Sequence, residues 1–566
     1  MTKPPANVNF TFDDAQLEKL KPYGEVRHHK PGDLLVEEGE SRTECLVTLS
    51  GYTNIFVSTP EGEKRVGWME RGQFAGDISV LTGQISLSRV EMGEEGDVLH
   101  ISHESFQRLL VDNSEISDAF VRTLTARRAF ANDAAHGSVI VIGDAHDRDV
   151  FAARDLLSKH VVPHTWLDPV KDPLAKRIMD AREIDEDALP VVIRGRSRIM
   201  SRPSVDELSK AFGLDLLPDG ATVDVIVVGA GPAGLAASVY AASEGLSVIT
   251  LDTDGPGGQA GTSSKIENYL GFPMGVSGRE LAARASIQAQ KFGARIAAPA
   301  KAVSLEKDGD GYCIGLHDGR HIRSRAVVIA TGAQYRRLPI ENLERYEGRG
   351  IYYGATPMEA QLCGGQEVAV VGAGNSAGQG AVFLSKTAKA VHVLYRRPDI
   401  RETMSEYLVR RLEEAPNIHL HPSTEIEALH GVEGAAPHED RLMETSFRSS
   451  ATGEIERCES PFVFLFIGAA PYTDWLPKHM SCDEKGFVKT GTDLANIDLV
   501  RAGWSLERMP TRYETSWPRV YAVGDVRIGS VKRVASSVGE GSVVVSDIHR
   551  AIAELRPASE DELAGA

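Results

Sequence analysis

The sequence predicts a multidomain chain, in which a small all-β domain of barrel type and a small α/β domain precede two nested, three-layered α/β domains. Three observations support this prediction. The chain has 566 residues, which is too many for one hydrophobic core. Its first part reads as short strands separated by turn residues. Its later part holds two copies of a pattern in which a buried strand, a glycine-rich turn and a helix follow one another.

The charge balance excludes some classes of partner. The chain has 62 Lys and Arg against 80 Asp and Glu, a formal net charge of −18. This balance argues against nucleic acid and anionic membranes as partners, since both require a basic surface. No apolar run is long enough to span a bilayer, and residues 1–14 contain no apolar signal core. We therefore expect a cytoplasmic protein.

Residues 1–133 form the predicted all-β domain. Short apolar runs such as Tyr52–Val57 lie between turns, a rhythm typical of an antiparallel barrel or sandwich. The pattern of turns and strands through Gly72–Ile78 resembles the cyclic nucleotide-binding domain. That family binds the cyclic phosphate with a Gly-Glu pair and a later arginine. Here Gly76-Asp77 and Ser86 occupy those positions, and Arg89 follows three residues later.

A buried phosphate without a guanidinium lacks its usual partner. The sequence therefore predicts that the first domain does not bind a cyclic nucleotide. It would instead be an interaction or regulatory module, and whether an effector binds residues 1–133 stays open.

Residues 134–216 form the predicted small α/β domain. The expected elements, in order, are a strand (Val139–Ile142), a helix (Arg148–Lys159), a strand (His164–Leu167), a helix (Pro173–Arg182), a hairpin (Val191–Met200) and a helix (Val205–Phe212), and Ala188-Leu189-Pro190 leads into the hairpin. This order resembles the thioredoxin or glutaredoxin fold, in which that proline is typically cis and faces a redox dithiol. Asp144-Ala145-His146-Asp147 stands where the dithiol would be. Since thiol–disulfide exchange requires thiols, we expect this domain to be a docking or spacer domain.

The first glycine turn follows the predicted strand Val223–Val228. It contains Gly229, Gly231 and Gly234, and Asp252 ends the next strand. In a dinucleotide-binding turn these glycines allow a tight turn, a close approach of the pyrophosphate, and close packing of helix on strand. The helix N-terminus then offers free N–H groups to the diphosphate.

The second glycine turn follows the predicted strand Val368–Val371. Its residues are Gly372, Gly374, Asn375, Ser376 and Ala377, and alanine in the last position is an accepted variant. Arginines stand where a site for NAD would place an acid, namely Arg396, Arg397 and Arg401. Because guanidinium groups fit a 2′-phosphate, this turn is predicted to bind NADPH.

Further motifs between and after the two glycine turns indicate which family the chain resembles. They are Gly257-Gly258-Gln259, Ile266–Pro273, Val328–Gly332, Phe466–Gly468 and Tyr521–Asp525. Over Val223–Ala553 the chain resembles the thioredoxin reductase family. The resemblance implies an FAD domain at 217–341 and 465–566, an NADPH domain at 342–464, and a homodimer. It implies that Asp525 binds the flavin ribityl chain and that Gln259 and Asn268 lie near FAD. Thr331, Gly332 and Gly524 complete the expected FAD residues.

The family's Cys-Ala-Thr-Cys motif is missing. The matching stretch is Tyr353–Met358, with Gly354 and Pro357 in place of the two cysteines. Cys363, nearby, has no second thiol and is expected to be a buried small residue. No Cys or His grouping has the spacing of zinc ligands, so no metal site is predicted, and no general acid or base is recognised.

The predicted function is transfer of hydride from NADPH to FAD and onward to an unidentified acceptor, which could be a redox protein. Two alternatives stay open. The first is a ferredoxin–NADP reductase-like enzyme, because thiol-free relatives in this family serve as ferredoxin–NADP reductases. The second is a sensor of NADPH or redox state that reports through residues 1–216.

Overall fold

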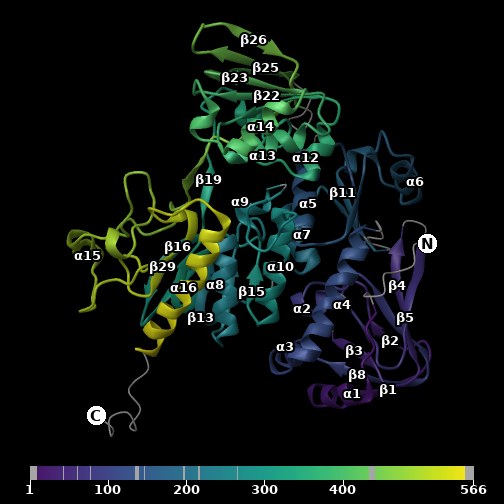
Figure 1. Ribbon diagram of the computed structural model, residues 1–566. Coiled ribbons are helices and arrows are strands. Elements are labelled where there is room, and N and C mark those ends of the chain that lie inside the picture. The colour runs from purple at the N-terminus through teal and green to yellow at the C-terminus, as the bar shows by residue number, and fades with distance from the viewer. Residues whose placement is uncertain are drawn as a thin grey trace.

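The computed structural model describes residues 9–41, 44–59, 62–76, 78–133, 139–145, 147–195, 198–214, 217–263, 265–432 and 440–554. Asp77 and His146, which the sequence analysis named, lie outside these ranges. In Figure 1 the N-terminal barrel lies at the lower right, the small α/β domain above it, and the two larger domains at the centre and top.

The N-terminal domain is a barrel made of two antiparallel four-stranded sheets. One sheet has the order β1 (Glu25–His29), β8 (Gly96–Ile101), β3 (Cys45–Thr48) and β6 (Phe74–Ala75). The other has the order β2 (Leu34–Val36), β7 (Arg89–Glu94), β4 (Tyr52–Thr59) and β5 (Gly62–Met69). Its helices are α1 (Asp14–Leu20), α2 (Ser79–Thr82), α3 (His103–Asp112) and α4 (Ser114–Asp133). Phe74 and Phe120 pack with ring centroids 4.5 Å apart, which joins α4 to the barrel core.

The small α/β domain has the strand order β10-β9-β11-β12. Strands β9 and β10 are parallel, whereas β11 is antiparallel to both β9 and β12. The elements are β9 (Val139–Ile142), α5 (Arg148–Lys159), β10 (His164–Leu167), α6 (Pro173–Ala181), β11 (Val191–Arg194), β12 (Arg198–Ser201) and α7 (Val205–Phe212). The Leu189–Pro190 peptide bond is cis. This topology is the one expected from the order of elements in the sequence.

The third domain, which we call the interrupted domain, is built on β13 (Thr222–Val228). Its sheet has the order β15-β14-β13-β18-β17-β16, and β29 also pairs with β18. The strands are β14 (Val248–Leu251), β15 (Arg295–Ala297), β16 (Ala302–Asp308), β17 (Gly311–Leu316), β18 (His321–Ile329) and β29 (Val520–Ala522). The helices are α8 (Pro232–Ser243), α9 (Gly258–Gly261), α10 (Gly278–Lys291), α15 (Asn496–Ala502) and α16 (Val534–Ala553). Helices α8 and α16 pack together beside this sheet (Figure 1).

The fourth domain, the inserted domain, is built on β21 (Glu367–Val371). Its parallel sheet has the order β20-β27-β21-β22-β23, beside a three-stranded sheet β24-β25-β26. The strands are β20 (Ile351–Tyr352), β22 (Ala390–Tyr395), β23 (Ile418–Pro422), β24 (Thr424–Val432), β25 (Arg441–Ser449), β26 (Ile455–Cys458) and β27 (Phe462–Leu465). The helices are α12 (Pro357–Leu362), α13 (Asn375–Leu384) and α14 (Glu406–Glu414).

Two chain crossings connect the interrupted and inserted domains. They run side by side, because β19 (Ala333–Tyr335) pairs with β28 (Ala469–Pro471) in an antiparallel ribbon. After β19 the chain passes through α11 (Leu343–Tyr346) before it enters the inserted domain. Among the described residues, no helix combines the length and apolar character needed to cross a bilayer.

Candidate functional site

The first glycine turn has the geometry of a dinucleotide-binding turn. Gly229 has φ +111°, and a Cβ there would lie 2.2 Å from the Ala330 carbonyl oxygen. A Cβ on Gly234 would lie 1.8 Å from the Gly229 carbonyl oxygen, so helix α8 packs on the turn without room for a side chain. At Gly231, by contrast, the nearest atom to such a Cβ is the Gly258 Cα, at 3.9 Å. The open space at the N-terminus of α8 therefore fits a diphosphate.

Asp252 fixes this turn from the end of β14. Its carboxylate accepts hydrogen bonds from the backbone N–H groups of Ala230 at 2.7 Å and of Asp254 and Gly255 at 3.0 Å each. Burial raises the pKa of the Asp252 carboxyl. The acid predicted to belong to the FAD site thus holds the backbone of the turn in place.

Asp525 has a buried oxygen that fits a ligand hydroxyl. Its Oδ1 is buried and forms no hydrogen bond with any described residue, and burial raises the pKa of its carboxyl. Gly524, before it, donates from its backbone N–H to Glu540 at 2.7 Å, and Arg527 pairs with the same Glu540 at 2.6 Å. A buried acceptor without a donor is costly, so a hydroxyl donor such as the ribityl chain fits here.

The other predicted FAD residues differ in their surroundings. Thr331 donates its hydroxyl to the Tyr472 carbonyl at 2.9 Å, and Gly332, with φ +62°, faces open space. The Gln259 amide donates to the Ala333 carbonyl. Asn268 lies exposed on a loop.

The second glycine turn repeats the geometry of the first. Gly372 has φ +146°, and a Cβ there would lie 2.5 Å from the Phe466 carbonyl oxygen. A Cβ on Gly374 would meet nothing within 4 Å, whereas Ala377 is fully buried in the domain core. Asn375 exchanges two hydrogen bonds with Ser405, at 2.9 and 2.7 Å. Ser376 is exposed beside it.

The three predicted arginines have different partners. Arg396, whose side chain is 79% exposed, lies 3.7 Å from Glu425. Arg397 pairs with Glu402, and Arg401 pairs with Glu413 at 2.5 Å, which raises the pKa of Arg401. Arg396 is therefore the arginine whose side chain is least engaged within the chain.

The position expected to carry the family's dithiol lies against the interrupted domain. A Cβ on Gly354 would lie 2.8 Å from Thr262 Cβ, and Thr262 comes three residues after Gln259. The Thr262 hydroxyl lies 3.1 Å from the Tyr335 hydroxyl, and the rings of Tyr335 and Tyr353 stack with centroids 5.7 Å apart. Sequence analysis did not identify this group of two tyrosines and a threonine, because its members belong to different domains.

Cys363 does not replace the dithiol. It is fully buried in the core of the inserted domain. Burial raises its pKa to about 12, so at neutral pH it is a protonated thiol and a poor nucleophile. The expectation of a buried small residue is confirmed.

The N-terminal barrel has no uncommitted cation at the two positions singled out in its sequence. Ser86 is buried and donates its hydroxyl to the Ser88 carbonyl at 2.8 Å. Arg89 forms two bonds to Glu63, at 2.8 and 2.9 Å, and one to Glu91 at 2.6 Å. Its guanidinium is therefore already neutralised by two carboxylates.

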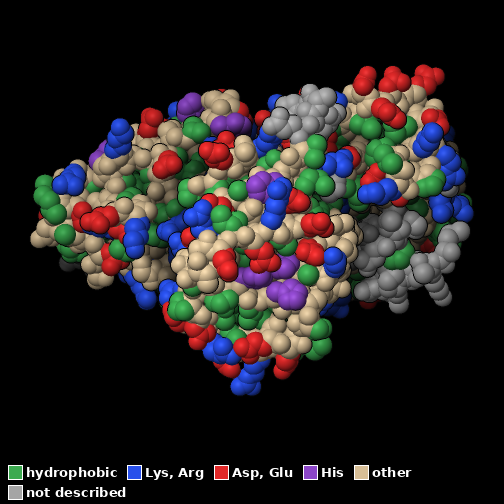
Figure 2. Space-filling view, turned by 90° about the horizontal axis from the view of Figure 1, so that it is seen from above, with side chains coloured by type: hydrophobic (Ala, Val, Ile, Leu, Met, Phe, Trp, Pro, Cys, Tyr) green, Lys and Arg blue, Asp and Glu red, His purple; other side chains and the backbone are tan. Residues whose placement is uncertain are grey.

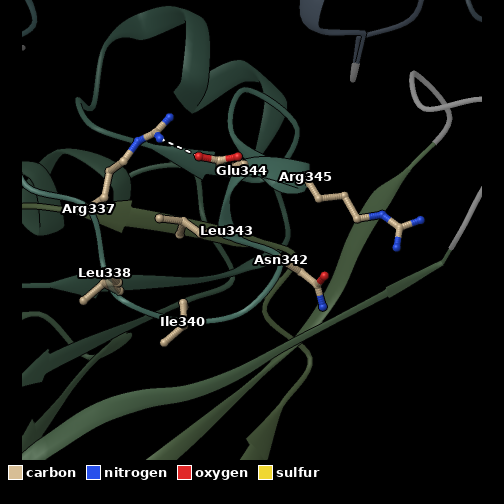
Figure 3. A pocket seen from close by; sticks show the side chains of 7 residues that line it. All are labelled: Arg337, Leu338, Ile340, Asn342, Leu343, Glu344 and Arg345. Atoms are coloured by element: carbon tan, nitrogen blue, oxygen red, sulfur yellow. Dashed lines mark hydrogen bonds and ion pairs between the residues drawn. The ribbon is translucent and has the colours of Figure 1, made fainter.

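A hollow of about 550 Å³ lies at the segment from β19 to α11, which we call the connector because it joins the two larger domains (Figure 3). Within it Arg337 pairs with Glu344 at 2.9 Å. Its lining residues are Arg337, Leu338, Ile340, Asn342, Leu343, Glu344 and Arg345. The hollow therefore belongs to the connector and not to either glycine turn.

Comparison with known proteins identifies the family. The family model described as pyridine nucleotide-disulphide oxidoreductase matches residues 223–541. The chain belongs to this family. The match confirms the nested dinucleotide-binding domains and the predicted cofactors, FAD and NADPH. A second model, the cyclic nucleotide-binding domain, matches residues 26–113 and confirms the fold class of the barrel.

Similar proteins agree with this assignment. The chain is 28% identical to a thioredoxin reductase of Bacillus subtilis over 59% of this chain and 96% of that protein. It is 31% identical to NADPH-dependent thioredoxin reductase 3 of Arabidopsis thaliana, over 58% of each chain. Among solved structures, thioredoxin reductase from T. acidophilum is 28% identical with a TM-score of 0.50, covering 58% of this chain and 98% of that one. The Lactococcus lactis enzyme is 25% identical with a TM-score of 0.51, covering 59% and 100%.

Proposed function

We propose that the protein is an NADPH-dependent flavoprotein oxidoreductase that passes electrons to an external acceptor without a dithiol of its own. FAD, when bound, accepts a hydride from NADPH and releases electrons to an acceptor. The chain's own residues bind and orient the two cofactors. The open space at Gly231 and the N-terminus of α8 support diphosphate binding. The unpartnered oxygen of Asp525 supports binding of a ribityl hydroxyl.

The second turn supports NADPH binding in the same way. Gly374 leaves open space before α13, and Arg396 offers an exposed guanidinium beside β22 for the 2′-phosphate. Asn375, held by Ser405, keeps the first turn of α13 attached to the loop before α14.

The observation that carries the proposal is the contact of Gly354 with Thr262, near Gln259. In this place the chain offers a threonine hydroxyl and two tyrosine rings but no thiol. Since a relay through the enzyme would need a thiolate and a resolving thiol, the acceptor must take electrons from the flavin itself. A ferredoxin-like protein, a quinone, oxygen or an external disulfide would each meet that requirement, and the first corresponds to a ferredoxin–NADP reductase-like enzyme.

A sensor role is the second candidate, and the position of α5 favours it. Phe151 on α5 packs against Tyr352 of the inserted domain, with ring centroids 5.6 Å apart. At the other end of α5, Lys159 packs against Gly255 of the interrupted domain, where a Cβ would lie 2.9 Å from the lysine Cβ. One helix of the small α/β domain thus contacts both larger domains. A change in the position of one of these domains relative to the other would therefore be transmitted through α5 to residues 1–216.

We also propose a homodimer. Three apolar side chains on and just before the helix pair of the interrupted domain are exposed, namely Tyr240 at 45%, Val543 at 51% and Val531 at 55%. Exposed apolar side chains on this helix pair would be covered in an interface with a second copy of the chain. Light scattering on the purified chain would give twice the monomer mass, whereas a monomer at all concentrations would refute this assembly.

Rapid mixing under anaerobic conditions tests the two functions against each other. The flavin is first reduced with NADPH, and ferredoxin, a quinone, oxygen or a small disulfide is then added while flavin absorbance is recorded. If the protein is an oxidoreductase, one acceptor should reoxidise the flavin far faster than the others. Slow reoxidation by all of them would contradict it and support the sensor.

A further inference from the structure

A glutamate, a histidine and a cysteine meet in the inserted domain. Glu367 begins β21, His392 lies in β22 and Cys458 ends β26. Each of the three offers one ligand atom, and these atoms lie within 4.8 Å of one another. The second glycine turn follows the opposite end of β21, about 16 Å away for a strand of this length. The group is therefore separate from the cofactor site.

The distances within the group suit a tetrahedral metal ion. Cys458 Sγ lies 3.4 Å from Glu367 Oε2, and His392 Nε2 lies 3.5 Å from the same oxygen. Typical zinc bond lengths to sulfur, nitrogen and oxygen would separate these atom pairs by about 3.6 and about 3.4 Å in a tetrahedron. Two of the three pairs of ligand atoms thus already stand close to the separations that a bound ion requires, and the third pair lies within 4.8 Å.

The side chains are held by their other atoms. Glu367 Oε1 pairs with Lys389 Nζ at 2.8 Å, which leaves Oε2 for the group. His392 Nδ1 lies 3.1 Å from His421 Nε2, while His392 Nε2 is buried and forms no hydrogen bond with a described residue. A neighbour that orients the far nitrogen of a histidine is the usual outer partner of a metal ligand.

We propose that Glu367, His392 and Cys458 bind one Zn²⁺ ion, with water as the fourth ligand. Thiolate, imidazole and carboxylate together favour zinc over the harder cations Mg²⁺ and Ca²⁺. On binding, the Cys458 thiol forms the S–Zn bond and releases its proton to solvent. The ion would tie β26 of the three-stranded sheet to β21 and β22. Figure 2 shows histidine side chains near the middle of the face that it draws.

Without a metal, the same group would be a thiol that donates a hydrogen bond to a carboxylate beside a largely buried histidine. Calorimetry distinguishes the two cases. The full chain, free of any affinity tag and treated with a chelator that is then removed, is titrated with ZnCl₂. The proposal predicts saturation at one ion per chain with a dissociation constant in the micromolar range or below. Titration with Co²⁺ should give the visible absorption bands of a tetrahedral thiolate site.

Variants locate the site. Cys458→Ser and His392→Gln should each weaken zinc binding at least 10-fold, and His421→Ala should weaken it by about 10- to 100-fold, the range expected for an outer partner. Cys313→Ser, which changes a half-buried thiol in the interrupted domain, should bind zinc as the unmodified chain does. Flavin content reports folding in every variant, and if Cys458→Ser loses its flavin then His392→Gln decides.

Two results would overturn the proposal. One is the lack of saturable zinc binding by the unmodified chain at micromolar concentrations. The other is unchanged affinity in folded His392→Gln protein.

Discussion

At the scale of single residues, the glycines of the first turn differ in what surrounds them. Gly231 faces open space, whereas Gly234 packs directly on backbone. The Gly231→Val variant should therefore still fold, but its valine side chain would occupy the space that the pyrophosphate needs. We expect this variant to purify without flavin, as measured by the ratio of flavin to protein absorbance.

Two other glycines provide controls for this experiment. Gly539→Ala, at an exposed helical position with nothing within 4 Å of the new Cβ, should keep full flavin content. Gly374→Val should also keep flavin but lose reduction by NADPH. Normal flavin content in Gly231→Val would show that the first turn does not bind FAD.

Arg396 is the residue on which nucleotide preference should depend most. Its guanidinium is exposed, while Arg401 is already paired with Glu413. Loss of one charge-assisted bond to a phosphate costs about tenfold in binding. We expect Arg396→Gln to lower the preference for NADPH over NADH by about tenfold, measured as rates of flavin reduction.

Arg410→Gln is the matched control, because Arg410 is an exposed arginine on α14 that pairs with Glu406. Its preference should stay unchanged. A preference for NADH in the unmodified chain would contradict the assignment of the second turn.

Residue identities could be predicted from the sequence where the chemistry is local. The geometry of the two glycine turns could be predicted, because it depends on neighbours within a few positions. The pairing of Arg401 with Glu413 and the stacking of Tyr335 on Tyr353 could not, since both depend on how separate segments pack. For the same reason the spacing of Cys458 and His392 in the sequence gave no sign of the proposed zinc site.

At the scale of elements, the barrel should fail to bind cyclic nucleotides. We predict from the sequence pattern that Ser86 stands where the family has its phosphate-binding arginine, and Arg89 on β7 is held by Glu63 and Glu91. A cyclic phosphate would have to break those ion pairs. Calorimetry with cyclic AMP and cyclic GMP should show no binding at micromolar concentrations.

Glu63→Gln, which frees part of the Arg89 guanidinium, is the informative variant here. If this variant gains measurable affinity for a cyclic nucleotide, the ion pairs of Arg89 prevent binding in the unmodified chain. Micromolar affinity in the unmodified chain would make the barrel a ligand-binding switch.

Helices and strands of the small α/β domain were predictable with little error. The predicted helix Arg148–Lys159 is α5, because Asp147 caps its N-terminus and apolar residues recur at helical spacing. The predicted helix Pro173–Arg182 ends one residue earlier, at Ala181. What the sequence could not provide was the place of α5 between two larger domains, since its contacts with Tyr352 and Gly255 are long-range.

At the scale of the whole molecule, the two larger domains are joined by the β19–β28 ribbon and by an ion pair between Glu267 and Arg411 at 2.8 Å. In this arrangement Gly354, and no thiol, faces Thr262, close to Gln259, which we propose lies beside the flavin. The described cysteines are all free thiols. Under the proposed function, the flavin is then the one group that holds the electrons delivered by NADPH.

Anaerobic titration with NADPH measures this directly. An enzyme with a dithiol takes up electrons at the flavin and again at its disulfide, whereas this chain should stop at about two electrons per FAD. Alkylation of its cysteines beforehand should leave that end point unchanged. Uptake of about four electrons per FAD, or reduction of thioredoxin that is abolished by Cys363→Ser, would contradict the account.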